Sequence, residues 1–144
     1  RNNQFAAPIY VGKAVPAGAR KGGFLDVSPG PVLYKRLSDD HARSIEQARN
    51  LDIKDFFCRY LVVDDFWIPL GEALLIDRFT PIWNVVIDGF GNHDPGSGRH
   101  NQQKSPWDVL HPGRPWAEKL QSNKMTADQV LENLRKFLAV GNKP

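Results

Sequence analysis

The sequence predicts an α/β (α+β) domain in which a small mixed or antiparallel central sheet is flanked by helices. Residues 56–63, FFCRYLVV, are apolar apart from Arg59, as expected of a strand buried on both faces. Helical periodicity follows over residues 69–79 and returns near the C-terminus. With 144 residues, 41% of them hydrophobic and 24% charged, the chain is long enough for one domain with its own core.

Two further elements precede the strand at 56–63. Ile9-Tyr10-Val11 is a β-rich segment that ends at Gly12, and Lys13 follows it directly. A helix is expected from Pro31 to about Asn50, with an apolar stripe that carries His41 near its middle. Cys58 belongs to the apolar strand and is therefore expected to be buried.

The helix at 69–79 is expected to lie almost wholly inside the protein. It can begin at Pro69, and it ends before Thr80 and the proline that follows. Apolar side chains cover most of its circumference, and Glu72 lies among them rather than on the polar edge. A partly buried carboxylate needs a cation, a metal or a proton. Glu72 is therefore either half of a salt bridge, to Arg36, Arg59 or a lysine, or a metal ligand.

The rest of the chain divides into three parts. Residues 83–87 are interpreted as a short extended segment, which completes a core of about residues 5–87. A loop of about residues 88–120 follows, and loops of this length inside a domain are usually functional or disordered. An amphipathic helix over about 126–140 is capped by Thr126, with Gln129 three residues on.

Composition excludes several classes of protein. The single cysteine rules out an internal disulfide and a Cys-rich zinc site, and it is consistent with a cytoplasmic location. No apolar run is long enough to span a membrane. A net charge of +3 permits nucleic acid as a partner without demanding it. Because the chain begins at Arg1 rather than at a methionine, we expect residues upstream to be missing.

The residues that could carry chemistry occur in a definite order. A strand ends in Tyr10-Val11-Gly12-Lys13, a helix carries Arg36 and His41, the next helix carries Glu72, and Asn84 follows. Singly, each has a structural explanation, such as an ion pair of Arg36 with Asp39 or Asp40. In this order they resemble the GIY-YIG nuclease family, in which Tyr10-Val11-Gly12 would correspond to the second motif, YIG. The segment NHDPGSGRHNQQKSPWDVLHPGRPW is similar to the type II restriction endonucleases of this family that recognise CCGCGG.

The sequence departs from the family pattern in two places. The strand with Gly-Ile-Tyr, which the family places upstream and pairs with the Tyr10 strand, is absent. The family usually places its arginine and histidine four residues apart on one helical face. Arg36 and His41 are five residues apart, which corresponds to about 140° around an ideal α-helix.

The resemblance implies a single nuclease domain, residues 1–144, with a GIY-YIG fold, a recognition loop and a C-terminal helix. It implies hydrolysis of phosphodiester bonds in double-stranded DNA at a GC-rich palindrome. One Mg²⁺ ion, the implied cofactor, would be held by Glu72 and would keep most of its waters. A palindromic site implies a homodimer with one active site for each strand.

Roles for the other residues follow from what such a reaction needs. Arg36 would bind the scissile phosphate, and Lys13 would do the same or lower the pKa of a neighbouring tyrosine. Asn84 would position the catalytic carboxylate or a phosphate oxygen. Either Tyr10 or His41 would accept the proton of the attacking water, and the sequence does not choose between them.

The long loop carries side chains that can read base edges in the major groove. Arginine and lysine pair with guanine, whereas asparagine and glutamine pair with adenine and reach other edges. The residues predicted to contact DNA are Arg99, His100, Asn101, Gln102, Lys104 and Arg114.

Two other functions remain open from the sequence. A non-catalytic, sequence-specific DNA-binding module would bind DNA in a salt-dependent way without cutting it. A zinc protein would use the histidine-rich loop residues His93, Asp94, His100 and His111 and would not depend on Glu72.

Overall fold

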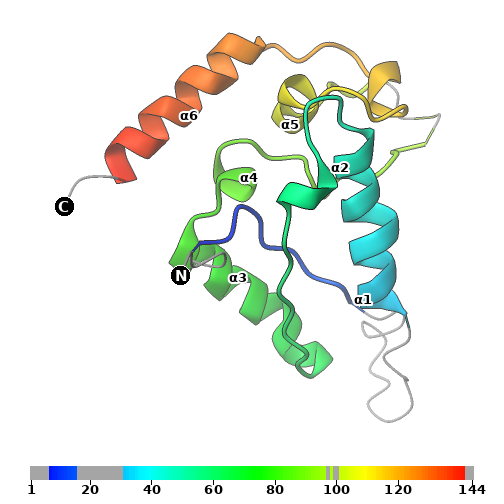
Figure 1. Ribbon diagram of the computed structural model, residues 1–144, viewed down its shortest axis with the longest axis vertical. Helices are drawn as coiled ribbons and strands as arrows, with labels where there is room; N and C mark the ends of the chain where they lie inside the picture. The colour runs from blue at the N-terminus through cyan, green and yellow to red at the C-terminus, as the bar shows by residue number, and fades with distance from the viewer. Residues whose placement is uncertain (1–6, 16–30, 97, 99–100, 142–144) are drawn as a thin grey trace.

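The fold is seen in a computed structural model that describes residues 7–15, 31–96, 98 and 101–141. These residues form helices joined by extended segments and loops (Figure 1). The α-helices are α1 (Val32–Lys35), α2 (Arg43–Gln47), α3 (Ile68–Phe79), α4 (Ile82–Val85), α5 (Pro106–Leu110) and α6 (Ala127–Gly141). The π-helix η2 (Arg36–Ala42) joins α1 to α2, and three short 3₁₀ helices are η3 (Ile53–Asp55), η4 (Asp65–Trp67) and η6 (Ala117–Lys119).

The core lies where α2, α4, α5 and the base of α6 meet. Trp107 is fully buried, and its ring packs edge-to-face against Trp83 and at a tilt against Phe90. Smaller buried side chains complete the cluster: Ile45, Ala48, Ile87 and Val130. Large aromatic side chains bury much apolar area for each residue ordered, so a few of them can hold several short helices together.

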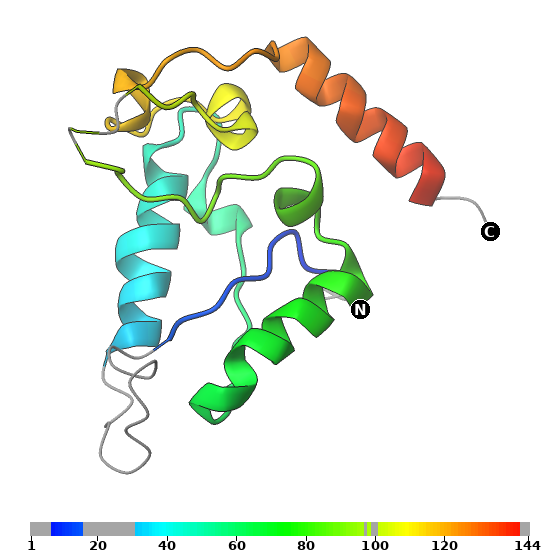
Figure 2. The ribbon, with the colours of Figure 1, turned by 180° about the vertical axis from the view of Figure 1, so that it is seen from behind.

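The predicted central sheet is wrong for the residues that the structure describes. Among them the only β-type pairing is an isolated bridge between Gln103 and Gln121. The segment with Tyr10 is extended and lies between α3 and the α1–α2 helix (Figure 2). Its backbone is paired with α4 instead of with a strand, because Trp83 N–H donates to Ile9 O at 3.0 Å and Asn84 bonds both backbone groups of Val11.

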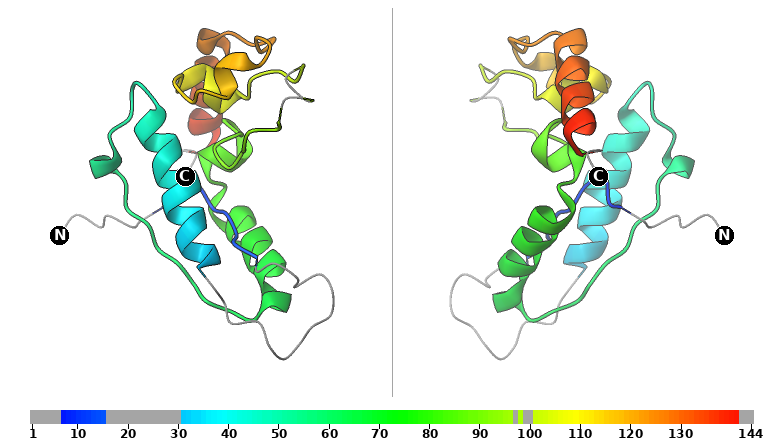
Figure 3. Two further views of the ribbon diagram at one scale, coloured as in Figure 1. Left: turned by 90° about the vertical axis from the view of Figure 1, so that its right-hand side faces the viewer. Right: turned by 90° about the vertical axis from the view of Figure 1, so that its left-hand side faces the viewer.

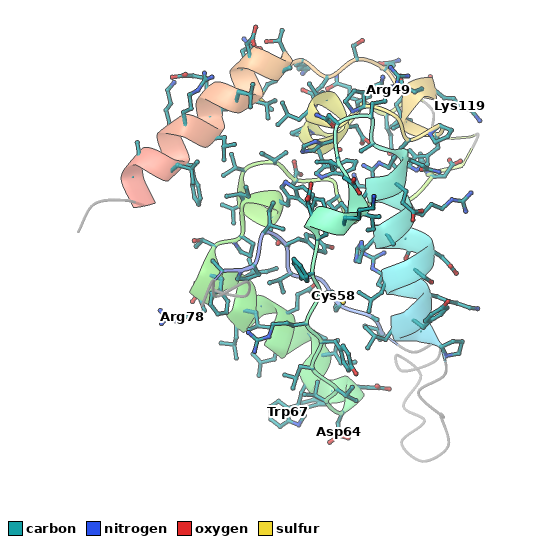
Figure 4. All side chains as sticks on the ribbon, in the orientation of Figure 1. Arg49, Cys58, Asp64, Trp67, Arg78 and Lys119 are labelled. Atoms are coloured by element: carbon teal, nitrogen blue, oxygen red, sulfur yellow. The ribbon has the colours of Figure 1, made fainter. Side chains whose placement is uncertain are left out.

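The segment 56–63 is also not a buried strand. It is extended, and it runs along the outside of the molecule from η3 towards η4 (Figure 3). Leu61 is 73% exposed, and Cys58, predicted to be buried, is exposed as well (Figure 4). A strand forms only where a neighbour satisfies its backbone groups, and the described residues place none beside this segment.

The helix predicted at 69–79 is confirmed in position, and its predicted burial is wrong. α3 begins with Pro69 in its first turn and ends at Thr80, which adopts a left-handed conformation with φ of 43°. The helix has no buried residue, and its exposed apolar side chains are Leu70, Leu74, Leu75 and Phe79. Residues 83–87 were expected to be extended, but the first three of them belong to the short helix α4, which ends at Val85.

The other two predicted helices are confirmed. The helix expected from Pro31 is present as α1, η2 and α2, and it ends at Gln47, before the predicted Asn50. At the C-terminus, Thr126 and Gln129 form the expected capping box through bonds of 2.8 and 3.3 Å. None of the described helices is both long and apolar enough to cross a membrane.

Candidate active site

The candidate site is centred on Tyr10, whose ring lies between the π-helix and the start of the long loop. Its ring meets His41 and Phe90 edge-to-face, with centroids 5.2 and 4.9 Å away, and His41 stacks on Phe90. The hydroxyl folds back over Gly12, where a Cβ atom would lie 2.6 Å from the Tyr10 oxygen. The glycine two residues after the tyrosine is therefore needed for room.

Asn84 holds the segment that carries Tyr10. Its Oδ1 accepts from Val11 N–H and its Nδ2 donates to Val11 O, both at 2.8 Å. One side-chain amide thus satisfies both backbone groups of the central residue in Tyr10-Val11-Gly12. The geometry makes Asn84 a support for the tyrosine backbone, whereas the sequence suggested that it would position a carboxylate or a phosphate.

The π-helix explains how Arg36 and His41 share a face despite their five-residue spacing. A π-helix is hydrogen-bonded from residue i to i+5 and its turn is wider than that of an α-helix, so residues five apart lie closer to one face. η2 begins at Arg36 and contains His41. Both side chains act on Tyr10, because His41 packs against its ring and the charge of the Arg36 guanidinium lowers the pKa of its hydroxyl. The α-helical estimate of 140° does not hold for this segment.

Arg36 is held by several partners. Its Nη1 donates to Asp40 Oδ2 at 3.0 Å and to His93 Nε2 at 2.6 Å, and its Nη2 donates to Gly91 O at 3.3 Å. A Cβ atom on Gly91 would approach both the Tyr10 oxygen and Arg36 Nη2. A side chain at this position would have to displace the ends of the Tyr10 and Arg36 side chains.

Glu72 pairs with Lys13 across the site. The Lys13 Nζ to Glu72 Oε2 distance is 2.6 Å, and the Glu72 side chain is 21% exposed. A lysine was one of the partners predicted for this carboxylate. The charges of both residues act on the Tyr10 hydroxyl, which joins this pair electrostatically to the Arg36 cluster.

Burial sets the protonation of the two candidate proton acceptors. It raises the pKa of the Tyr10 hydroxyl, against the effect of Arg36, so the phenol keeps its proton at neutral pH. Burial, with the nearby Arg36 charge, lowers the pKa of His41 to about 4, so this imidazole is neutral. Arg36 Nε and His41 Nδ1 are buried without a hydrogen-bond partner among the described residues, which leaves them available to a bound group.

The donor set fits a magnesium ion better than zinc. Mg²⁺ in phosphoryl-transfer sites needs only one or two carboxylates, because waters and substrate phosphates supply its other ligands. Glu72 is such a carboxylate. The described part of the chain contains no group of three His, Cys, Asp or Glu residues that could hold a metal. Of the predicted zinc set, His93 bonds Arg36, His111 lies 3.2 Å from Asn50, and His100 lies outside the described residues.

Arg114 has a different place from the one predicted for it. We expected it to contact DNA, but it is 1% exposed. Its guanidinium pairs with the buried Asp108 at 2.7 Å and lies between the rings of Trp107 and Trp116, 4.3 and 4.6 Å from their centroids. It also donates to three loop carbonyls, those of Gly89, Phe90 and Asn92. Arg114 therefore anchors the start of the loop from inside.

The other predicted DNA contacts lie at the surface or outside the described residues. Asn101 and Gln102 are exposed. Lys104 is half-buried and pairs with Glu118 at 2.8 Å, which lowers the pKa of that carboxyl. Arg99 and His100 fall among the residues that are not described.

Comparison with known families identifies the chain. The sequence model of the family described as the Eco29kI GIY-YIG domain matches residues 1–138. The chain belongs to this family. The match supports a nuclease of the restriction-endonuclease class, for which DNA is the implied partner. A comparison with curated proteins gave no match.

Within this GIY-YIG domain, sequence reasoning missed the roles of three residues that hold the site. His93 contacts Arg36, Gly91 gives the hydroxyl of Tyr10 room, and Asp108 neutralises Arg114. The Arg36–Asp40 pair, by contrast, is one of the two ion pairs that the sequence suggested for this arginine. The three missed residues come from the long loop, whose path has no periodicity from which contacts could be predicted.

Proposed function

We propose that this GIY-YIG domain is a Mg²⁺-dependent type II restriction endonuclease that cuts double-stranded DNA at a GC-rich palindrome. The observation that carries the proposal is the meeting of Tyr10, Arg36 and His41 beside the Lys13–Glu72 pair. Five residues from three separate parts of the chain converge there, in the order that the family motif has.

Each of these residues has its own role in the proposed hydrolysis of the phosphodiester bond. Arg36 and Lys13 supply positive charge for the scissile phosphate, where negative charge grows in the transition state. His41 accepts the proton of the attacking water, because it is neutral at neutral pH while Tyr10 retains its own proton. The Tyr10 hydroxyl is then a hydrogen-bond donor to a phosphate oxygen.

Glu72 is the residue that would hold the metal. Mg²⁺ bound there would act as a Lewis acid on the phosphate oxygens. Lys13 keeps the carboxylate in place, at 2.6 Å, and offsets its charge next to Tyr10. Asn84 supports this arrangement indirectly, by fixing the backbone between Tyr10 and Gly12.

Recognition of a GC-rich site is assigned to the loop. In this proposal Arg99 and Lys104 read guanine, and Asn101 and Gln102 contact neighbouring edges. Arg114 is left out, because its side chain is buried. Two copies of the chain would act on a palindrome, and light scattering with and without cognate DNA would measure the expected mass of a homodimer.

Digestion of a supercoiled plasmid tests the proposal. The wild type is expected to give discrete fragments with Mg²⁺ and none with EDTA, and mapping the ends would give the recognised sequence. Glu72→Gln should lower the rate by roughly 100-fold or more, because it removes the anionic ligand and keeps the side chain's shape. Glu46→Gln, an exposed glutamate on α2, is the matched control and should cut normally.

Two results would overturn the proposal in different ways. Salt-sensitive DNA binding by the wild type, without cleavage in Mg²⁺, would make the chain a binding module. Full cleavage by a correctly folded Glu72→Gln variant would place the active site elsewhere.

A further inference from the structure

The loop residue His93 makes contacts that the proposed mechanism does not yet use. Its Nε2 lies 2.6 Å from Arg36 Nη1, and its Nδ1 lies 3.5 Å from Asp40 Oδ1. Its side chain is 58% exposed, so packing does not explain its position. His93 and Asp40 also line an open hollow of about 340 Å³ at the surface beside η2.

Donor and acceptor chemistry fixes the tautomer of this histidine. An arginine has only donors, so the nitrogen that faces Arg36 must offer a lone pair. Nε2 is therefore unprotonated and the ring proton sits on Nδ1, the nitrogen that lies 3.5 Å from Asp40 Oδ1. The three residues form one cluster, because Asp40 and His93 lie beside each other and both bind the same arginine nitrogen.

The position of His93 is itself set by the buried anchor of the loop. Arg114 donates to the carbonyls of Gly89, Phe90 and Asn92, the residues just before His93. One carbonyl of the same stretch, that of Gly91, accepts from Arg36 Nη2. The loop thus contacts both terminal nitrogens of the arginine from a backbone that is fixed from inside.

We propose that His93 is a positioning residue that holds the Arg36 guanidinium in place as an acceptor, in its neutral Nδ1–H form. The inference rests on the proposed nuclease function and goes beyond it, because it assigns to the loop a role in building the active site as well as in contacting DNA. Without this acceptor, one hydrogen of Arg36 Nη1 loses its partner and the guanidinium can rotate away from Tyr10.

Two amide substitutions separate this role from a general structural one. The amide oxygen of glutamine reaches about as far as Nε2, whereas that of asparagine reaches only as far as Nδ1. His93→Gln can therefore accept from Arg36, and His93→Asn cannot. A third variant, His93→Ala, removes the ring altogether. Because His93 is largely exposed, all three variants should unfold at nearly the wild-type temperature.

The first test is single-turnover cleavage at saturating DNA with Mg²⁺, alongside DNA binding measured without metal. We expect His93→Ala and His93→Asn to cut about tenfold or more slowly, with binding changed less than about twofold, because misplacing a binding group affects the rate more than affinity. His93→Gln should recover most of the rate. Wild-type rates for all three variants, or a rate for His93→Gln as low as that for His93→Ala, would overturn the proposal.

The second test does not depend on cleavage. Nitrogen NMR of the histidine rings should show His93 protonated at Nδ1 in the wild type, with assignment from the signal lost in His93→Gln. Arg36→Ala should shift it towards the Nε2–H form, while His111 serves as an internal reference. A wild-type His93 protonated at Nε2 would overturn the proposal. Absence of cleavage by the wild type would refute the proposed function alone, and the NMR result would still decide the role of His93.

Discussion

Apolar side chains are buried in one region of this GIY-YIG domain and exposed in another. Around Trp83, Phe90 and Trp107, apolar side chains from four helices are buried against one another. From residue 56 to the end of α3, side chains just as apolar are exposed, among them Phe57, Tyr60, Leu61, Val62, Phe66, Trp67, Leu70 and Leu74. The candidate site lies against the first region, at Phe90.

This difference shows that an apolar segment is buried only where another part of the chain packs against it. The loop after residue 88 is rich in polar residues, yet it supplies Phe90, Trp107, Asp108 and Arg114 to the interior. The segment 56–63 is the most apolar stretch of the chain, yet the described residues place no strand beside it.

The largest effect is expected from Arg114→Met. The variant leaves the buried Asp108 carboxylate without its partner and removes three hydrogen bonds to the loop backbone. Removing one partner of a buried ion pair costs about 3–5 kcal/mol in the free energy of unfolding. Urea denaturation would measure it. Arg135→Met, which breaks an exposed pair with Glu132, is the control and should cost less than about 1 kcal/mol.

A smaller loss is expected from Asn84→Ala. It leaves the N–H and C=O of Val11 without their hydrogen bonds, and an unsatisfied, partly buried group costs about 1–3 kcal/mol. Denaturation gives the energy, and faster amide exchange at Val11 would locate the change. Asn133→Ala, on the exposed side of α6, should be nearly neutral. Unchanged exchange at Val11 would show that Asn84 does not hold this segment.

His41 is expected to make stability depend on pH. Its pKa is about 4 in the folded protein against an ordinary 6.5, so the unfolded chain binds the proton more readily between these values. The free energy of unfolding should therefore fall as the pH falls from about 6.5 to about 4, and the contribution of His41 is complete above 6.5. His41→Phe cannot titrate, and its stability should fall less over the same range. Parallel curves for the two proteins would contradict the assigned burial.

The smallest effect is expected in the exposed region. Leu61→Ser should change the free energy of unfolding by no more than about 0.5 kcal/mol, because the side chain is 73% exposed. Ile45→Ala, in the core, should cost about 2–5 kcal/mol. A cost for Leu61→Ser close to that of Ile45→Ala would mean that the extended segment packs against a partner in solution, and the contrast between the two regions would disappear.

Features that depend on neighbouring residues were predicted correctly from the sequence, whereas features that depend on distant parts of the chain were missed. Helix limits at Pro69 and Thr80 and the capping box at Thr126 depend on neighbours within four residues, and they are confirmed. The central sheet failed because a strand requires a partner from elsewhere in the chain. Arg114 was predicted to contact DNA from its residue type. That prediction was wrong because two tryptophans and an aspartate enclose its side chain, which residue type alone cannot show.

For the candidate site, motif order was a better guide than helical geometry. Tyr10, Arg36, His41 and the Lys13–Glu72 pair lie within one electrostatic neighbourhood, as their order in the family motif suggested. The five-residue spacing of Arg36 and His41 could not be interpreted with an α-helix. It fits once η2 is π-helical, which is the state that one extra residue produces in a helix.

Changing the length of η2 tests most directly whether Arg36 and His41 act together on Tyr10. Deleting the exposed Asp39 should convert the π-helix into an α-helix with the pair four residues apart, still on one face, and single-turnover cleavage should persist. Inserting an alanine after Asp39 separates the pair and should lower the rate by roughly 100-fold. Loss of cleavage by a folded deletion variant, or normal cleavage by the insertion variant, would contradict the shared face.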